Sequence, residues 1–123
     1  MTNPTEILVG QLAERFLKTS KRLVTAESCT GGGLAENLTR FPGSSSWFDC
    51  GFITYSNQSK QDILSVSSET IEEFGAVSEE VAFEMAKGAL EGNSIPAFIK
   101  GDFISTAYGV RTWDVAGGKA VLF

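Results

Sequence analysis

One short stretch of this chain restricts its fold more than any other. Residues 23–26 form an apolar run, residues 27–30 are polar, residues 31–33 are three consecutive glycines, and residues 34–40 have the composition of a helix. The apolar run is long enough for a buried strand, and the glycines permit a tight turn. The stretch therefore predicts a strand, a glycine turn and a helix, which is the unit from which layered α/β folds are built.

The rest of the chain alternates in the same way. Periodic apolar residues predict helices over 4–18 and from Ser78 to Gly92, where Ser78 is a good N-cap, and shorter helices are expected over 57–64 and 67–74. In the first helix the predicted apolar stripe consists of two rows, Leu8, Leu12 and Phe16 beside Val9, Ala13 and Leu17. An aromatic and β-branched segment over 47–55 predicts a second strand. The expected fold class is α/β, with a mixed or mostly parallel sheet covered by helices.

The pattern weakens after residue 92. Strands are expected over 97–99, 103–107 and 119–123, while residues 108–118 show no clear period and are predicted to be irregular. No repeat, low-complexity segment or linker divides the chain, so its 123 residues are expected to form one domain.

Composition excludes several functional classes. The chain has no histidine, which excludes Ser-His-Asp and Cys-His catalysis and histidine metal ligands. Its net charge is −5 and no segment collects basic residues, so neither a nucleic acid nor an anionic membrane is an expected partner. Cys29 and Cys50 lack the spacing of a zinc site and fit a reducing compartment. Without a signal peptide or a long apolar segment, a cytoplasmic protein with a small-molecule or protein partner is expected.

The first candidate site lies between the first strand and the glycines. Ser28, Cys29 and Thr30 are predicted at the carboxyl end of a strand, the edge of an α/β sheet where ligands bind. The main-chain N–H groups of residues 29–33 are expected to be unpaired and able to hold a phosphate or an oxyanion. The alternative is a plain glycine turn with a Ser or Thr N-cap, because a Gly-Gly-Gly sequence without a following lysine is a weak phosphate motif.

The second candidate site follows the second strand. Tyr55 and Lys60 are predicted to meet at the end of that strand, and a lysine can activate a serine nucleophile when it is held in a site with little water. The alternative is an ordinary exposed helix lysine, with Tyr55 covering the core. Glu27 is a further candidate, because a carboxylate at the end of a strand could pair with Lys60 or contact the ligand; the alternative is a carboxylate that is simply exposed at the surface. Spacing alone does not pair Ser28 with Lys60.

Several segments together resemble one known family. In chain order they are TAESCTGG at 25–32, PGSS at 42–45, GFITYSN at 51–57 with Lys60, GAVS at 75–78 and EMA at 84–86. This ordered set resembles the CinA C-terminal domain family, whose members act as nicotinamide-mononucleotide deamidases. The match extends from about residue 5 to residue 90, and several linked motifs at the right separations are more specific than any one of them.

The resemblance implies a three-layer α/β sandwich that hydrolyses the carboxamide of nicotinamide mononucleotide without a metal or a cofactor. It places the family's nucleophile on Ser28, its general base on Lys60 and its assisting tyrosine on Tyr55. Main-chain N–H groups near Thr30 and Gly31 would hold the oxyanion. The substrate-binding residues implied by the motifs are Glu27, Thr30, Gly31, Gly32 and Asn57.

The chain departs from the family pattern after Leu90. Residues 106–113 (TAYGVRTW) stand where the family has a T-G-x-A-G-P loop, and the family's final strand and helix have no counterpart. This departure leaves two functional hypotheses open: an active amidohydrolase, or a catalytically impaired member that acts as a binding or interaction protein. An uncovered sheet edge also invites association, so a homo-oligomer is expected.

Overall fold

The computed structural model describes residues 3–92, 104–105, 111–114 and 119–122 of the chain. Its elements follow one another in the order α1 (Pro4–Thr19), β1 (Arg22–Glu27), α2 (Gly33–Thr39), a 3-10 turn η1 (Ser44–Ser46), β2 (Phe48–Ile53), α3 (Asn57–Leu64), α4 (Ser68–Phe74), α5 (Glu79–Glu91), β3 (Ile104–Ser105), β4 (Arg111–Asp114) and β5 (Lys119–Leu122). The fold is therefore mixed α/β, as the alternating sequence pattern predicts.

Strand β1 lies inside a mixed sheet with the order β2-β1-β5-β4-β3. It pairs in parallel with β2, with Thr25 opposite Gly51 and Glu27 opposite Ile53, and it also pairs in parallel with β5. Strands β4 and β5 are antiparallel to each other, and so are β3 and β4. The carboxyl ends of β1 and β2 consequently lie at the same edge of the sheet.

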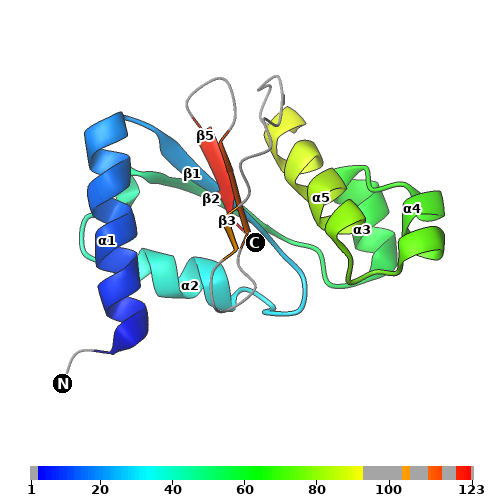
Figure 1. Cartoon of the computed structure of the whole chain (residues 1–123), viewed down its shortest axis with the longest axis horizontal. Helices are drawn as coiled ribbons and strands as arrows, with labels where there is room; N and C mark the ends of the chain where they lie inside the picture. Colours follow the sequence, from blue (N-terminus) through cyan, green and yellow to red (C-terminus); the bar gives the residue numbers. More distant parts are fainter. Residues whose placement is uncertain (1–2, 93–103, 106–110, 115–118, 123) are drawn as a thin grey trace.

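Helices lie on both sides of the β1–β2 pair (Figure 1), with α1 and α2 on one side and α3, α4 and α5 on the other. Successive side chains of a strand point to opposite faces, and β1 supplies both apolar clusters. Leu23 packs with residues of α1 and α2 and with Trp47, whereas Val24 and Ala26 pack with residues of α3 and α5. Strand β1 is therefore buried on both faces, which fixes the position of the loop that follows it.

Only part of the predicted stripe of α1 is buried. Val9, Ala13 and Phe16 are buried, but Leu8 and Leu17 are 51% and 60% exposed. Phe16 stacks on Trp47 with ring centroids 5.9 Å apart, and Trp47 is 1% exposed, as expected of a core residue. Leu12 is partly buried against the same cluster, so the burial of the full two-row stripe was a wrong prediction at its two outer members, Leu8 and Leu17.

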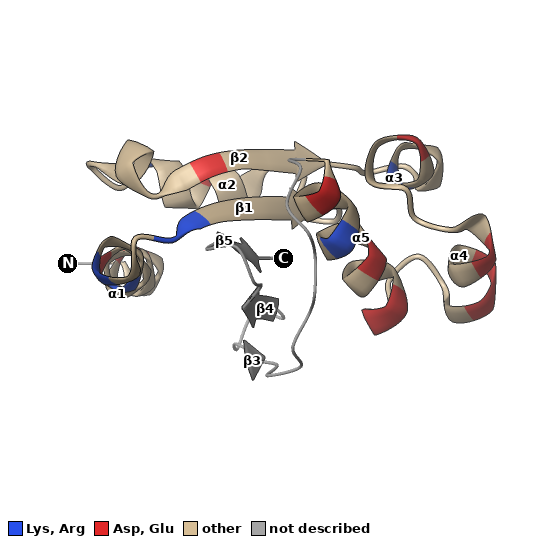
Figure 2. Cartoon of the chain, turned by 90° about the horizontal axis from the view of Figure 1, so that it is seen from above, with Lys and Arg blue, Asp and Glu red and all other residues tan. Residues whose placement is uncertain are grey.

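Local capping signals are confirmed. The side chain of Ser78 accepts a hydrogen bond from the Val81 N–H at 3.2 Å, and Ser67 caps α4 in the same way. Acidic residues recur along α4 and α5 (Figure 2), among them Glu69 and Glu72 on α4 and Glu79 and Glu80 on α5. Glutamates in the first turn of a helix stabilise it through the helix dipole.

The prediction for the last third of the chain was partly wrong. Strand β4 (Arg111–Asp114) lies within the segment 108–118 that was expected to be irregular, and its pairing with β5 explains why it is extended despite a weak local pattern. Strands β3 and β5 coincide with two of the expected strands. The third, at 97–99, lies outside the described residues, as do residues 106–110 and 115–118.

Candidate active site at the ends of β1 and β2

Both candidate segments leave the same edge of the sheet. Loop 28–32 follows β1, and residues 54–56 follow β2, the parallel neighbour of β1. The Thr54 N–H donates to the Glu27 carbonyl at 2.9 Å, so the two strand ends are joined directly. The sequence motifs that carry Ser28 and Lys60 therefore begin at adjacent strand ends.

The carboxylate of Glu27 is the most extensively bonded group at this edge. Its Oε1 accepts hydrogen bonds from Thr30 Oγ1 at 2.7 Å, the Gly32 N–H at 3.1 Å and the Leu34 N–H at 2.8 Å. Its Oε2 accepts from the Ala35 N–H at 3.0 Å, and the residue is only 3% exposed. Glu27 thus ties the end of β1 to the first turn of α2, whose N–H groups have no partner within the helix.

The glycine turn is internally bonded, which corrects one expectation. Gly31 and Gly32 have positive φ angles of 60° and 109°, a conformation that favours glycine. The Gly31 N–H donates to the Ser28 carbonyl at 3.0 Å, and the Gly33 N–H donates to the Thr30 carbonyl at 3.0 Å. Together with the bond from Gly32 to Glu27, these contacts show that the N–H groups of 29–33 are not all unpaired.

The loop leaves two main-chain donors open. Neither the Cys29 nor the Thr30 N–H donates a hydrogen bond to any residue that the structure describes. Both residues are exposed, and Ser28 beside them is half-buried. The thiol of Cys29 is free. Any oxyanion site in this loop would therefore use the N–H groups of Cys29 and Thr30, and the N–H of Gly31 would not contribute.

Lys60 is buried at the neighbouring strand end. It lies in the first turn of α3, is 3% exposed, and its Nζ donates to the Tyr55 main-chain carbonyl at 3.1 Å. No carboxylate of the described residues pairs with it, and Glu27 directs its own carboxylate to α2. The alternative of an exposed helix lysine is wrong, because this side chain is buried.

Tyr55 and Asn57 lie at the surface. Tyr55 is 71% exposed, so it does not cover the core, and it contacts Lys60 through its carbonyl. Asn57 is exposed at the start of α3, where Ser56 is the N-cap. Among the described residues no direct hydrogen bond joins Ser28 and Lys60. The catalytic hydrogen bonds of unliganded enzymes are often long and shorten only in the substrate complex.

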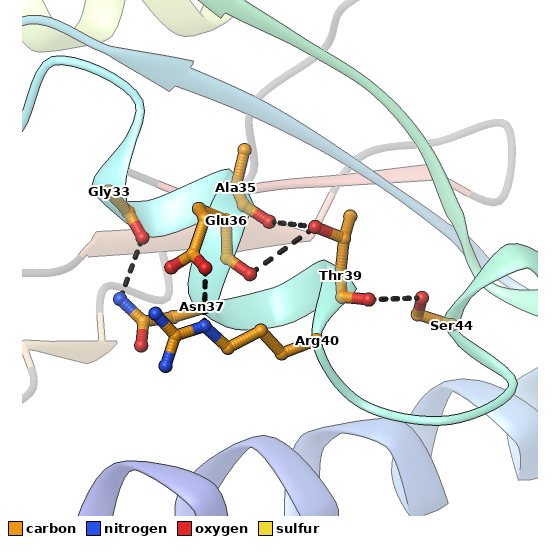
Figure 3. A network of polar contacts seen from close by, with 7 residues as sticks. All are labelled: Gly33, Ala35, Glu36, Asn37, Thr39, Arg40 and Ser44. Atoms are coloured by element: carbon orange, nitrogen blue, oxygen red, sulfur yellow. Dashed lines mark hydrogen bonds and ion pairs between the residues drawn. The ribbon is translucent and has the colours of Figure 1, made fainter.

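Polar contacts lie along α2 and connect its last residue to the turn that follows (Figure 3). Arg40 pairs with Glu36, Asn37 donates to the Gly33 carbonyl at 2.7 Å, and Ser44 donates to the Thr39 carbonyl at 3.2 Å. The hydrogen bond and the charge of Glu36 raise the pKa of Arg40 above its usual value. Helix α2 is therefore bonded at both ends, by Glu27 at its start and by the contact from Ser44 to Thr39 at its end.

The part of the chain that the structure describes contains neither a candidate metal site nor a candidate membrane-spanning helix. No three or more Cys, Asp or Glu side chains there are grouped so that they could hold a metal ion. None of the helices there is long and apolar enough to cross a membrane.

Sequence reasoning missed the way Glu27 is used. It placed Glu27 near the ligand or near Lys60, but the carboxylate bonds to the helix that begins six residues later. A signal was present in the sequence, because a carboxylate just before a glycine turn can reach the free N–H groups of the next helix. The motif also contains Thr54, which is fully buried and has a side-chain hydroxyl without a partner among the described residues.

Comparison with known proteins supports the reading of these motifs. Residues 5–95 match the CinA C-terminal domain. The chain is 46% identical over 87 residues to "Nicotinamide-nucleotide amidohydrolase PncC" from Pseudomonas putida, covering 71% of this chain and 54% of that protein. It is 54% identical over 90 residues to a CinA-like protein from Chlorobium phaeobacteroides, covering 73% of this chain and 21% of that protein.

A solved structure shows the same fold. The competence/damage inducible protein CihA from Agrobacterium tumefaciens superposes with a TM-score of 0.75 at 33% identity, covering 100% of this chain and 81% of that chain. The matched region spans about half the length of the PncC relative and about a fifth of the CinA-like protein.

Proposed function

Because this chain belongs to the CinA C-terminal domain family, we propose that it is an amidohydrolase that converts nicotinamide mononucleotide to nicotinate mononucleotide and ammonia. Relatives named nicotinamide-nucleotide amidohydrolase support the substrate class. The observation that carries the proposal is the placement of Lys60, which is 3% exposed and bonded to a main-chain carbonyl at the strand end beside the Ser28 loop. A serine nucleophile and a buried lysine form the arrangement of Ser-Lys catalysis, and the burial of Lys60 supports this role.

In the proposed reaction Ser28 is the nucleophile. Its Oγ attacks the carboxamide carbon while Lys60, assisted by Tyr55, takes the hydroxyl proton. The C–N bond then breaks, the proton passes to the leaving ammonia, and an ester links the acyl group to Ser28. Water attacks this ester, releases the carboxylate and restores the hydroxyl. One water is consumed for each ammonia released, and neither a metal nor a cofactor takes part.

The loop after β1 supplies the proposed oxyanion donors. The negative charge that develops on the amide oxygen would be held by the Cys29 and Thr30 N–H groups, which have no acceptor among the described residues. Asn57 and the main chain of Gly31 and Gly32 complete the proposed substrate-binding surface. Gly31 would shape this surface, because its N–H donates to the Ser28 carbonyl and holds the loop in a turn.

A second candidate function rests on the last third of the chain. The match to the family ends at residue 95, and residues 106–113 replace the loop that family members use. The chain would then be a catalytically impaired member that acts as a binding or interaction protein. Calorimetric titration with nicotinamide mononucleotide separates the two: an active enzyme binds and turns over, whereas an impaired member gives no sustained reaction heat.

The proposal extends to the organisation of the molecule. Residues 1–123 would form one domain, a three-layer sandwich. Pairing of β5 with β1 supports the single domain, since the last described strand joins the first. The protein would act in the cytoplasm on a small nucleotide, as a homo-oligomer, without nucleic acid or membrane.

The catalytic assignment is tested with three variants of the full chain. Ser28→Ala and Lys60→Ala should each remove most of the ammonia-forming activity, while Cys29→Ala should retain it. Because nucleophile and base act as a unit, the double variant Ser28→Ala/Lys60→Ala should be little slower than either single variant. Activity that survives Ser28→Ala but not Cys29→Ala would move the nucleophile to the thiol.

A further inference from the structure

We propose that Glu27 is a positioning residue, a role that rests on the amidohydrolase function proposed above. Glu27 would not touch the substrate. It would hold loop 28–32 in the shape that sets Ser28 and the Cys29 and Thr30 N–H groups around the reacting carboxamide.

The hydrogen bonds of Glu27 carry this inference. Four donors from the loop and from α2 converge on one carboxylate: Thr30 Oγ1, Gly32 N, Leu34 N and Ala35 N, at 2.7 to 3.1 Å. Both oxygens are therefore occupied, and with 3% exposure the side chain offers no face to a ligand. A carboxylate placed in this way is stabilised by the N-terminus of the helix and by charge-assisted hydrogen bonds.

The geometry of the loop explains why the position of Glu27 matters. Gly31 and Gly32 have positive φ angles, and glycine can adopt many other conformations. Glu27 and the start of α2 bracket this flexible pair, and Gly32 bonds directly to the carboxylate. Helix α2 is separately fixed at its far end by the contact between Ser44 and Thr39 (Figure 3). Loss of the carboxylate would therefore release the loop more than the helix.

The experiment compares three variants of the full chain with nicotinamide mononucleotide as substrate. Glu27→Ala removes all four acceptor contacts. Glu27→Gln keeps an oxygen in the place of Oε1 but puts an amide NH2 opposite the Ala35 N–H, so one contact is lost. Glu36→Gln is the matched control, because it neutralises an exposed carboxylate on α2 without touching loop 28–32. Thermal unfolding of each variant sets an assay temperature at which all are folded.

If Glu27 is a positioning residue, its substitution should lower kcat strongly and change KM little. A displaced oxyanion donor weakens the transition state more than the bound substrate, so kcat should fall about 100-fold in Glu27→Ala and about 10-fold in Glu27→Gln. KM should change less than about threefold, and Glu36→Gln should match the wild type. If Glu27→Ala fails to fold, Glu27→Gln carries the test, since it retains three of the four contacts.

Two results would overturn the positioning role. A higher KM at unchanged kcat in the Glu27 variants would show that Glu27 contacts the substrate. A kcat of the Glu27 variants equal to that of Glu36→Gln would show that Glu27 has no effect on the reaction. A wild type that releases no ammonia would instead refute the proposed function. In that case hydrogen exchange of the Gly32, Leu34 and Ala35 amides decides whether Glu27 holds the loop: faster exchange in Glu27→Gln supports it, and unchanged exchange overturns it.

Discussion

Replacing Gly88 by alanine should destabilise the protein through one close contact between α3 and α5. A Cβ added at Gly88 would lie 1.8 Å from the Leu64 carbonyl oxygen and 2.6 Å from its carbonyl carbon. Ordinary van der Waals contact begins near 3.4 Å, so the two helices would have to move apart by more than a bond length. Leu64 ends the helix that carries Lys60, and the same movement would disturb the candidate base.

The size of the effect follows from two opposing terms. Overpacking against main-chain atoms costs about 3 kcal/mol, the upper part of the range for core insertions. Alanine regains about 1 kcal/mol of helix propensity relative to glycine. The free energy of unfolding should therefore fall by about 2 kcal/mol, which lowers Tm by on the order of 8 °C for a domain of this size.

Gly10→Ala is the matched control for this prediction. Gly10 also lies inside a helix, but a Cβ there would meet only the Phe41 ring, at 3.5 Å. The same propensity gain without the clash should leave Tm unchanged or raise it. Both variants can be followed by circular dichroism during thermal unfolding. A Gly88→Ala protein that is as stable as Gly10→Ala would refute the close approach of α3 and α5.

Three further predictions concern single side chains. Lys60→Met should lower kcat at least about 100-fold in a coupled ammonia assay, because it removes the candidate base. Its free energy of unfolding should equal or exceed that of the wild type, because an apolar residue of similar volume replaces a buried polar amine that has a single hydrogen-bond partner. Thr25→Val should raise the free energy of unfolding by about 1 kcal/mol in urea titration, because the buried Thr25 hydroxyl has no partner among the described residues. A lower free energy of unfolding would show that this hydroxyl does have a hydrogen-bond partner. Arg40→Ala should leave the urea midpoint unchanged, because the Arg40–Glu36 pair is exposed to solvent. A clearly lower midpoint would show that this pair stabilises the fold.

Local signals in the sequence predicted most of the helices. Ser78 and the two glutamates after it define the start of α5 by chemistry contained within one turn, and the structure confirms that start. The face that a helix buries depends on its neighbours, and periodicity does not encode it. Leu8 and Leu17 satisfy the apolar period of α1 but remain exposed, because they lie outside the face of α1 that packs on the core.

The candidate site was predicted in its parts, and tertiary packing determines how they are joined. The strand, turn and helix around Ser28 follow from apolar and glycine patterns that any reader of the sequence can see. The burial of Lys60 does not, because an exposed and a buried lysine look the same at the first turn of a short helix. The use of Glu27 also depends on tertiary geometry, since it required β1 and α2 to bring four donors to one carboxylate.

Product analysis of the wild-type protein tests the central claim most directly. The purified chain of 123 residues is incubated with nicotinamide mononucleotide, and ammonia and nicotinate mononucleotide are quantified in the same samples. The account predicts that both products appear in equal amounts, over many turnovers, and that the Ser28→Ala protein forms neither. Failure of the folded wild type to form nicotinate mononucleotide, or equal formation by Ser28→Ala, would contradict it.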